Sequence, residues 1–205
     1  MPDNIIHNFL IIWATVDPIG TMVLFAGLTA NLTAKERRKT AFKTIAYATI
    51  ILIGAIVIGQ ILLSAMGISL LSFQVAGGVI LFLFGLQMIF SSGASKQAGE
   101  PLHDVAVFPL AVPATASPGA ILAVILITDN NLYSIEEQVV TTSVMLLVMV
   151  LTLLLLLLSG GIIRIIGNAG ASLLTRIMGM ILAALSVEFV MEALGVAKWV
   201  AAIPQ

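Results

Sequence analysis

The sequence contains no cysteine and few charged residues, and both absences restrict what the protein can be. Without cysteine it can form no disulfides and offer no thiolate ligands to a metal. Charged residues make up only 9% of the 205 positions and hydrophobic residues 60%, far from the composition of a soluble globular domain. The net charge of -1 gives no indication of a nucleic-acid partner. We therefore expect an integral membrane protein whose surroundings are the lipid bilayer.

Six stretches of the chain are long and apolar enough to cross a bilayer, since a spanning helix needs about 20 mostly apolar residues. Transmembrane strands would alternate in polarity, whereas these runs are continuous. The predicted fold is all-α, with six transmembrane helices in one membrane domain. The stretches are residues 5–29, 41–65, 69–91, 105–128, 138–159 and 174–196.

The distribution of lysine and arginine predicts the orientation of the chain. Positive residues are retained on the cytoplasmic side, so both termini are expected outside the cytoplasm, together with the acidic loop that contains Asp129, Glu136 and Glu137. A lipid-headgroup or nucleic-acid patch is the alternative interpretation of the basic cluster. The residues assigned to the cytoplasmic side are Lys35, Arg37, Arg38, Lys39, Lys43, Lys96, Arg164 and Arg176, and only Lys198 falls on the other side.

The two halves of the chain resemble each other at a shift of about 100 residues. NLTAKE at residues 31–36 aligns with NLYSIEE at residues 131–137, and each contains an S/T-x-x-E capping box. The shift also aligns Gly78 with Gly179 and Gln87 with Glu188. Three spans in each half would give the halves opposite orientations, an inverted repeat typical of secondary transporters. The predicted repeats are residues 1–95 and 96–205, joined by the polar residues 91–103.

Asp17 and Pro18 interrupt the first apolar stretch, in the sequence TVDPIGT, and Ser117 and Pro118 interrupt the fourth, in FPLAVPATASPGAI. Proline removes a backbone donor and clashes with the preceding turn, while Asp and Ser are favoured N-caps and Pro is favoured at the first helical position. Each stretch is therefore predicted to break and restart near its middle. Paired breaks in corresponding spans indicate a transport site.

The two predicted half-helix starts differ in charge. Asp17 can offset the positive end of its own helix dipole, whereas neutral Ser117 cannot, so we expect the Ser117 end to be free for an anion. A carboxylate facing free N–H groups is complementary to a small zwitterion. The alternative interpretation is that Asp17 only caps a kinked helix. The predicted substrate-binding residues are Asp17, Pro18, Gly20, Thr21, Ser117, Pro118, Gly119 and Ala120.

Ion coupling would require a second polar group at depth. The candidates are Asp17, Glu188 and Gln87, and the ion is a proton or sodium. Alternatively, Glu188 lies near the outer interface beside Glu192.

No pattern indicates an enzyme. A hydrolase within the membrane would need paired aspartates, a Ser-His pair or an H-E-x-x-H helix. Asp17 has no obvious second aspartate at its depth, and His7 and His103 sit at the ends of apolar stretches. We expect no catalysis, no cofactor and no metal.

Three motifs resemble the MarC family, also called the neutral amino acid transporter family. They are DPIG followed by the basic segment, VAGGVILFLFGLQMI at residues 75–89, and FPLAVPATASPGAI at residues 108–121. The resemblance spans essentially the whole chain and implies a six-helix inner-membrane protein, grouped with amino-acid exporters of the lysine-exporter superfamily. The family pattern has Asn and Gly where this chain has Thr21 and Ser117.

The repeat and the paired breaks predict an ion-coupled secondary transporter. The resemblance implies that it is an exporter or exchanger and that its substrates are small neutral amino acids such as glycine and alanine. The alternative is a channel or a structural membrane protein that transports nothing. The sequence does not indicate an oligomeric state.

Overall fold

The computed structural model describes residues 2–90 and 104–196, and every regular element in this part of the chain is a helix. The sequence predictions for the linker at residues 91–103, which includes Lys96, and for Lys198 lie outside the described residues. The elements are α1 (Pro2–Val16), α2 (Pro18–Leu28), α3 (Ala34–Ala65), α4 (Leu70–Phe90), the π-helical η1 (Ala106–Thr115), α5 (Pro118–Leu126) and α6 (Ile135–Ala193).

Five helices are long and apolar enough to cross a membrane, or six if η1 and α5 form one bent span. This confirms the predicted all-helical membrane fold. α6 contributes two spans, Ile135–Gly167 and Ala169–Ala193, separated at Gly167, whose φ of 66° and ψ of 175° suit glycine. Arg164 and Arg176, predicted between spans, therefore lie on α6 itself, because one glycine suffices to turn the chain.

The helices begin where their caps lie. α3 starts at Ala34, before the apolar stretch predicted from residue 41, because Thr33 and Glu36 form the predicted capping box. Ser134 and Glu137 form the second predicted capping box, at the start of α6. Hydrophobicity marks the part of a helix that lies in lipid, whereas the cap marks where the helix begins.

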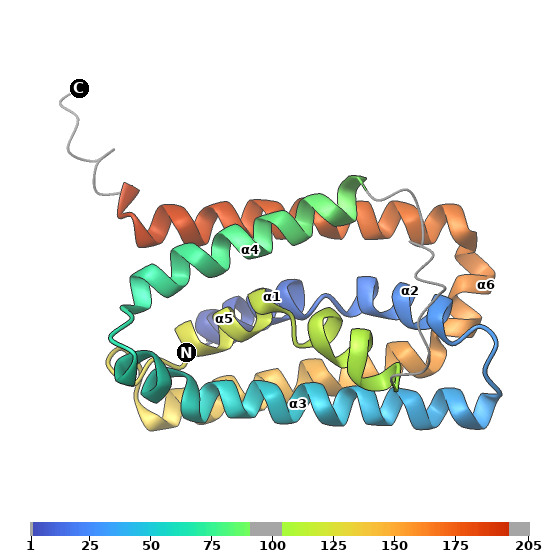
Figure 1. Cartoon of the computed structure of the whole chain (residues 1–205), viewed down its shortest axis with the longest axis horizontal. Helices are drawn as coiled ribbons and strands as arrows, with labels where there is room; N and C mark the ends of the chain where they lie inside the picture. Colours follow the sequence, from blue (N-terminus) through green and yellow to red (C-terminus); the bar gives the residue numbers. More distant parts are fainter. Residues whose placement is uncertain (1, 91–103, 197–205) are drawn as a thin grey trace.

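The broken helices lie between two layers of long ones (Figure 1). α4 and the second half of α6 form one outer layer, and α3 and the first half of α6 form the other. α1, α2, η1 and α5 occupy the middle layer, where the largest buried side chains include Phe25, Leu110 and Leu122. The spans with non-helical backbone are thus covered by protein on both sides, as the bilayer requires.

The two ends of this bundle differ in charge. One end, called here the basic end, carries Lys35, Arg38 and Lys39 at the start of α3, together with the end of α4 and the turn within α6. The opposite end, called the acidic end, carries Asp129 after α5 and Glu136 in the first turn of α6.

Glycines bring α4 and α6 into close contact in the first outer layer. A Cβ atom on Gly85 would lie 2.8 Å from the carbonyl oxygen of Gly179, and a Cβ on Gly179 would lie 2.8 Å from the carbonyl oxygen of Gly85. A Cβ on Gly78 would meet the Ser186 carbonyl oxygen at 3.1 Å. Small residues therefore set the helix separation here, as they do in many membrane proteins.

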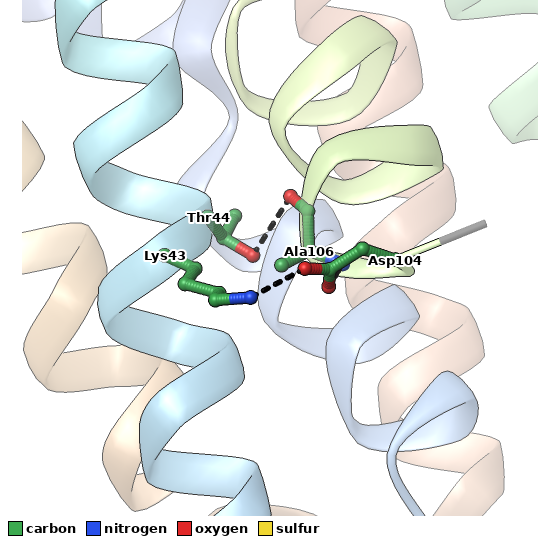
Figure 2. Close-up of polar contacts among 4 residues, drawn as sticks. All are labelled: Lys43, Thr44, Asp104 and Ala106. Atoms are coloured by element: carbon green, nitrogen blue, oxygen red, sulfur yellow. Dashed lines mark hydrogen bonds and ion pairs between the residues drawn. The ribbon is translucent and has the colours of Figure 1, made fainter. Parts of the chain in front are cut away.

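Polar contacts fix the start of η1 against α3 at the basic end (Figure 2). The Lys43 ammonium donates to the Asp104 carboxylate at 2.6 Å, and the Thr44 hydroxyl donates to the Ala106 carbonyl oxygen at 3.2 Å. This ion pair lowers the pKa of the Asp104 carboxyl, chiefly through the hydrogen bond from Lys43. The ion pair is largely exposed, so it orients η1 without contributing much to stability.

Candidate functional site

The first span is interrupted at a single residue, Asp17, as predicted. Its φ of 48° and ψ of 67° place it in the left-handed region, which Asp tolerates better than most residues. One carboxylate oxygen, Oδ1, accepts from the Gly20 N–H at 3.0 Å and caps α2. Pro18 stands at the first helical position, where its missing N–H costs nothing.

Backbone hydrogen bonds continue on both sides of this break. The Asp17 N–H donates to the Trp13 carbonyl oxygen at 3.1 Å, and the Thr21 N–H donates to the Asp17 carbonyl oxygen at 3.0 Å. α1 and α2 together are therefore long and apolar enough to form one membrane span over Ile5–Leu28. The break therefore changes the surroundings of the Asp17 side chain, while the chain continues in much the same direction.

The fourth span is interrupted over a longer segment. Pro109 and Pro113 lie inside η1, where Phe108 and Val112 have extended backbone angles. α5 restarts at Pro118 and is bent by 52° relative to η1. Both predicted breaks thus occur within a few residues of their prolines.

The two breaks are in direct contact. The Ser117 hydroxyl donates to the Thr15 carbonyl oxygen at 2.8 Å, and the Thr21 hydroxyl donates to the Ala114 carbonyl oxygen at 3.3 Å. Carbonyl groups freed by the interruptions are satisfied by side chains of the other broken span. The sequence predicted a small zwitterion between the two half-helix starts, whereas these hydrogen bonds join the two breaks directly.

A cavity of about 180 Å³ lies on one side of the paired breaks. All of its lining residues belong to the half of the bundle between the breaks and the basic end, and its rim includes the exposed Leu24 and Gln87. They are Asp17, Gly20, Thr21, Leu24, Phe84, Gln87, Met88, Ala114 and Thr175.

Asp17 is the only charged residue that lines this cavity, and its side chain is only 2% exposed. Its second carboxylate oxygen, Oδ2, has no protein donor among the described residues. No fully buried side-chain oxygen or nitrogen in this part of the chain lacks a partner, so Oδ2 faces the cavity. The cavity thus holds a carboxylate oxygen ready to accept from a ligand.

The other lining groups are neutral. Gln87 offers an amide, Thr21 and Thr175 offer hydroxyls, and Phe84 and Met88 provide apolar wall. At about 30 Å³ per water molecule, the volume corresponds to roughly six waters. Such a space suits a small ligand with a cationic group for Asp17 and acceptors for the amide and hydroxyl donors.

Gly20 keeps the carboxylate in this position. A Cβ atom there would lie 2.8 Å from Asp17 Cγ and 3.0 Å from Met88 Cε. Only glycine leaves the Asp17 side chain room to fold back onto the helix start and still reach the cavity.

The half-helix start at Ser117 does not line the cavity. The Ser117 hydroxyl accepts from the Ala120 N–H at 2.9 Å, so the expectation of an uncapped end there is wrong: serine is itself an N-cap. Ser117, Gly119 and Ala120 are buried, and Pro118 is half-buried. Leu81 covers this start, because a Cβ atom on Gly119 would lie 3.1 Å from Leu81 Cγ.

The two further candidates for ion coupling are not brought together. Gln87 lines the cavity, whereas Glu188 is exposed on α6, close to its end at the acidic end of the bundle. Glu192, four residues further on, accepts from the Gln74 amide at 3.2 Å. This position agrees with the alternative interpretation, in which Glu188 lies near the membrane interface.

Several lining residues were missed by the sequence analysis. Phe84 and Met88 flank Gln87, which the internal repeat had already marked, so the repeat was a usable signal for this part of α4. Thr175, Ala114 and Leu24 carry no sequence signal, because their role depends on how α6, η1 and α2 pack.

Comparison with known proteins gives a consistent assignment. Residues 3–198 match the model of the MarC family integral membrane proteins. The inner membrane protein MarC of Salmonella paratyphi A is 28% identical over 201 residues, covering 90% of this chain and 91% of the relative. A membrane protein of Buchnera aphidicola is 31% identical over 197 residues, covering 92% of this chain and 91% of the relative. No solved structure matches.

Proposed function

This chain belongs to the MarC family of integral membrane proteins, and we propose from that premise that it is a secondary transporter of small neutral amino acids such as glycine and alanine. The proposal places it in the inner membrane, for which several relatives are named, and gives it the role of an exporter or exchanger. The names of the Salmonella and Buchnera relatives state no substrate, so the proposed substrate class is argued from the cavity.

One observation carries the proposal: a buried carboxylate at a helix break points one oxygen into a small cavity. An aspartate at this depth costs at least about 2.5 kcal/mol on insertion scales. Asn would cap α2 and tolerate its left-handed backbone without that cost. The charge at Asp17 therefore has a use beyond capping, and binding a cationic group is the simplest one.

A small neutral amino acid fits the arrangement of polar groups. Its ammonium would pair with Asp17 Oδ2, and its carboxylate would accept from the Gln87 amide and the Thr21 or Thr175 hydroxyl. The apolar wall formed by Phe84 and Met88 leaves room for a short side chain only. The buried Ser117 to Ala120 helix start remains part of the proposed site as a second region, which a ligand reaches only after Leu81 moves.

Ion coupling is proposed at the same carboxylate. Asp17 can exchange the substrate ammonium for a proton or for sodium, with the oxygen of the Gln87 amide as a second ligand. Glu188 is less suited to this role because it does not line the cavity.

We also propose that the protein is built as two inverted three-helix repeats with both termini outside the cytoplasm, so that the basic end is cytoplasmic. Corresponding features support this relation. The capping boxes at Thr33 and Ser134 start α3 and α6, and the caps at Asp17 and Ser117 start α2 and α5. Alternating access in many transporters arises from such a relation between halves.

Uptake and binding of labelled glycine and alanine in proteoliposomes test the proposal, with wild type compared with Asp17→Asn. Asn keeps the cap and tolerates the left-handed backbone, but it removes the charge. Substrate affinity should fall by about tenfold to 150-fold, as expected for a hydrogen bond to a charged group. The matched control is Asp129→Asn, which changes a buried aspartate at the acidic end that does not line the cavity.

Accumulation of substrate against its gradient distinguishes a transporter from a channel or a structural protein. Affinity unchanged in correctly folded Asp17→Asn protein would show that Asp17 is only a cap. Equal losses in Asp17→Asn and Asp129→Asn would show that the effect is not specific to the cavity.

A further inference from the structure

Gln60, near the end of α3, binds the far end of α5 through both atoms of its amide. Its Nε2 donates to the carbonyl oxygens of Thr128 at 3.3 Å and Ile125 at 3.4 Å, and its Oε1 accepts from the Asn130 N–H at 3.1 Å. A half-buried side chain thus joins a long outer helix to the C-terminal end of a half-helix. We call this set of hydrogen bonds the acidic-end latch.

Close packing accompanies the latch. A Cβ atom on the neighbouring Gly59 would lie 2.8 Å from Ile125 Cγ1. α3 and α5 are therefore in tight contact at the acidic end, where the chain leaves α5.

The corresponding place at the basic end has no such connection. α2 ends much as α5 does: the Thr29 hydroxyl donates to the Phe25 carbonyl oxygen at 2.6 Å, and the Thr128 hydroxyl donates to the Val124 carbonyl oxygen at 2.5 Å. The repeat shift places Gly160 at the position of Gln60. Within the described residues, no hydrogen bond joins α6 to the end of α2.

Glycine leaves this position without a polar side chain. The space beside Gly160 is occupied by Arg37, whose guanidinium donates to the Ser159 hydroxyl at 3.0 Å and lies 5.9 Å from the centre of the Phe25 ring. A Cβ atom on the next glycine, Gly161, would meet nothing within 4 Å. The end of α2 is thus held by packing, whereas the end of α5 is held by hydrogen bonds.

The cavity lies on the side without the latch. Its lining residues all belong to the basic-end half, while the helix start at Ser117 is buried on the other side of the breaks. The structure therefore combines an open basic end with a fastened acidic end.

We propose that Gln60 is a positioning residue that holds the acidic end closed, and that release of its hydrogen bonds lets α5 leave α3 and opens a route to Ser117 from the acidic end. The two openings exclude each other, since the broken spans are joined through the Ser117 to Thr15 and Thr21 to Ala114 hydrogen bonds. Only the description of this movement as a transport step rests on the proposed function.

Thiol labelling tests the latch and needs no substrate. Because the chain has no cysteine of its own, an introduced cysteine is its only thiol. Two separate reporters are needed, Ala114→Cys in the cavity and Ala120→Cys at the buried helix start that Ser117 caps. Each is combined with Gln60→Ala, and the rate of reaction with a small, water-soluble maleimide is measured on purified protein in detergent. Loss of three hydrogen bonds should raise the rate at Ala120→Cys by at least about tenfold. The rate at Ala114→Cys should fall.

The matched control is Gln138→Ala. Gln138 also donates at the acidic end, to the Asn130 side-chain oxygen and the Tyr133 carbonyl oxygen, but it does not connect α3 to α5. An equal rise in labelling with this control would overturn the proposal. So would an unchanged rate at Ala120→Cys. A rise at both reporters would also overturn it, because it would indicate general loosening of the bundle and not alternate opening of its two ends.

If Gln60→Ala does not fold, a second variant tests the acidic-end latch. Gly59→Val inserts bulk between α3 and Ile125, and should raise the rate at Ala120→Cys in the same way. Gly54→Val on the same helix is its control, because a Cβ atom there would meet nothing within 4 Å. Equal labelling in Gly59→Val and Gly54→Val proteins would contradict the latch.

Discussion

The first span is interrupted at one residue and continues in nearly the same direction, whereas the fourth is irregular from Ala106 to Thr115 and bends by 52°. Both restart with a capping side chain followed by proline, yet of the two capping residues only Asp17 lines the cavity of about 180 Å³. The Ser117 hydroxyl donates to Thr15 and accepts from Ala120, so its donor and one acceptor site are used within the protein. Asp17 caps α2 with one carboxylate oxygen, and its second oxygen has no protein donor among the described residues.

This difference shows that a carboxylate cap, which has two acceptor atoms, can satisfy a helix start and still leave one acceptor without a protein donor. A carboxylate satisfies the helix start and remains chemically available, while a hydroxyl in the same position is consumed by the fold. The same contrast explains why Gly20 and Gly119 have different surroundings. A Cβ atom on Gly20 would displace the Asp17 carboxylate, whereas one on Gly119 would collide with Leu81 in the core.

The largest effect on stability is expected from Gly119→Val at the second break. Leu81 is 1% exposed and has no space into which it can withdraw, so overpacking should lower the free energy of unfolding by up to about 3 kcal/mol. Gly27→Val is the control, since Gly27 lies on the exposed side of α2 with nothing within 4 Å of its Cβ position. Thermal unfolding in detergent measures both. Equal stability of the two variants would show that the second break is not closely packed.

A smaller effect should distinguish the caps themselves. The free energy of unfolding of Asp17→Ala should be about 2 kcal/mol lower than that of Asp17→Asn, because Ala loses the cap and also disfavours the left-handed backbone. Comparing Ala with Asn keeps the loss of charge constant. Ser134→Ala, which removes the exposed cap of α6, should cost only about 1 kcal/mol, since φ at Ser134 is an ordinary -65°. Equal costs at the two positions, by unfolding in detergent, would refute the assigned strain at Asp17.

The smallest effect concerns how the two broken spans are anchored at their beginnings. α1 is held by a neutral hydrogen bond from the Asn8 amide to the Thr141 hydroxyl at 2.9 Å, and η1 by the ion pair of Lys43 with Asp104. Lys43 lowers the pKa of Asp104 in the folded protein, so this pair contributes stability above the ordinary aspartate pKa, near 4. The contribution is lost as the pH falls through the lowered pKa.

Lys43→Met should therefore slightly reduce the melting temperature at pH 7 and reduce it less at pH 3, because the ion pair is progressively lost as Asp104 is protonated. Asn8→Ala should lower the melting temperature equally at both pH values, because neither Asn8 nor Thr141 titrates. A Lys43→Met effect of the same size at both pH values would show that packing of the lysine stem, not the ion pair, anchors η1.

Local patterns predicted the elements of this protein well. Apolar runs located the spans, S/T-x-x-E located the starts of α3 and α6, and the Asp-Pro and Ser-Pro pairs located both breaks. Each of these features depends on residues within one or two helical turns, so the sequence contains the whole signal. The resemblance to the MarC family was likewise confirmed over nearly the whole chain.

The candidate site was only partly predictable, because local patterns identify some of its residues and the packing of distant helices determines the others. Asp17, Gly20 and Thr21 follow from the break and line the cavity, and Gln87 was marked by the repeat. Glu188 shares the repeat position of Gln87 but is exposed on α6, near the opposite end of the bundle. Positions that the sequence repeat aligns therefore need not have equivalent surroundings in the folded protein.

The sequence by itself determined the membrane-spanning helices, their caps and the two interruptions, because bilayer thickness, proline and capping act locally along the chain. Only the tertiary structure decided which interruption lines a cavity. That outcome depends on Leu81 covering Gly119, on Ser117 meeting Thr15, and on Gln60 reaching the end of α5. These are contacts between residues far apart in the chain, and the packing of helices against one another determines them.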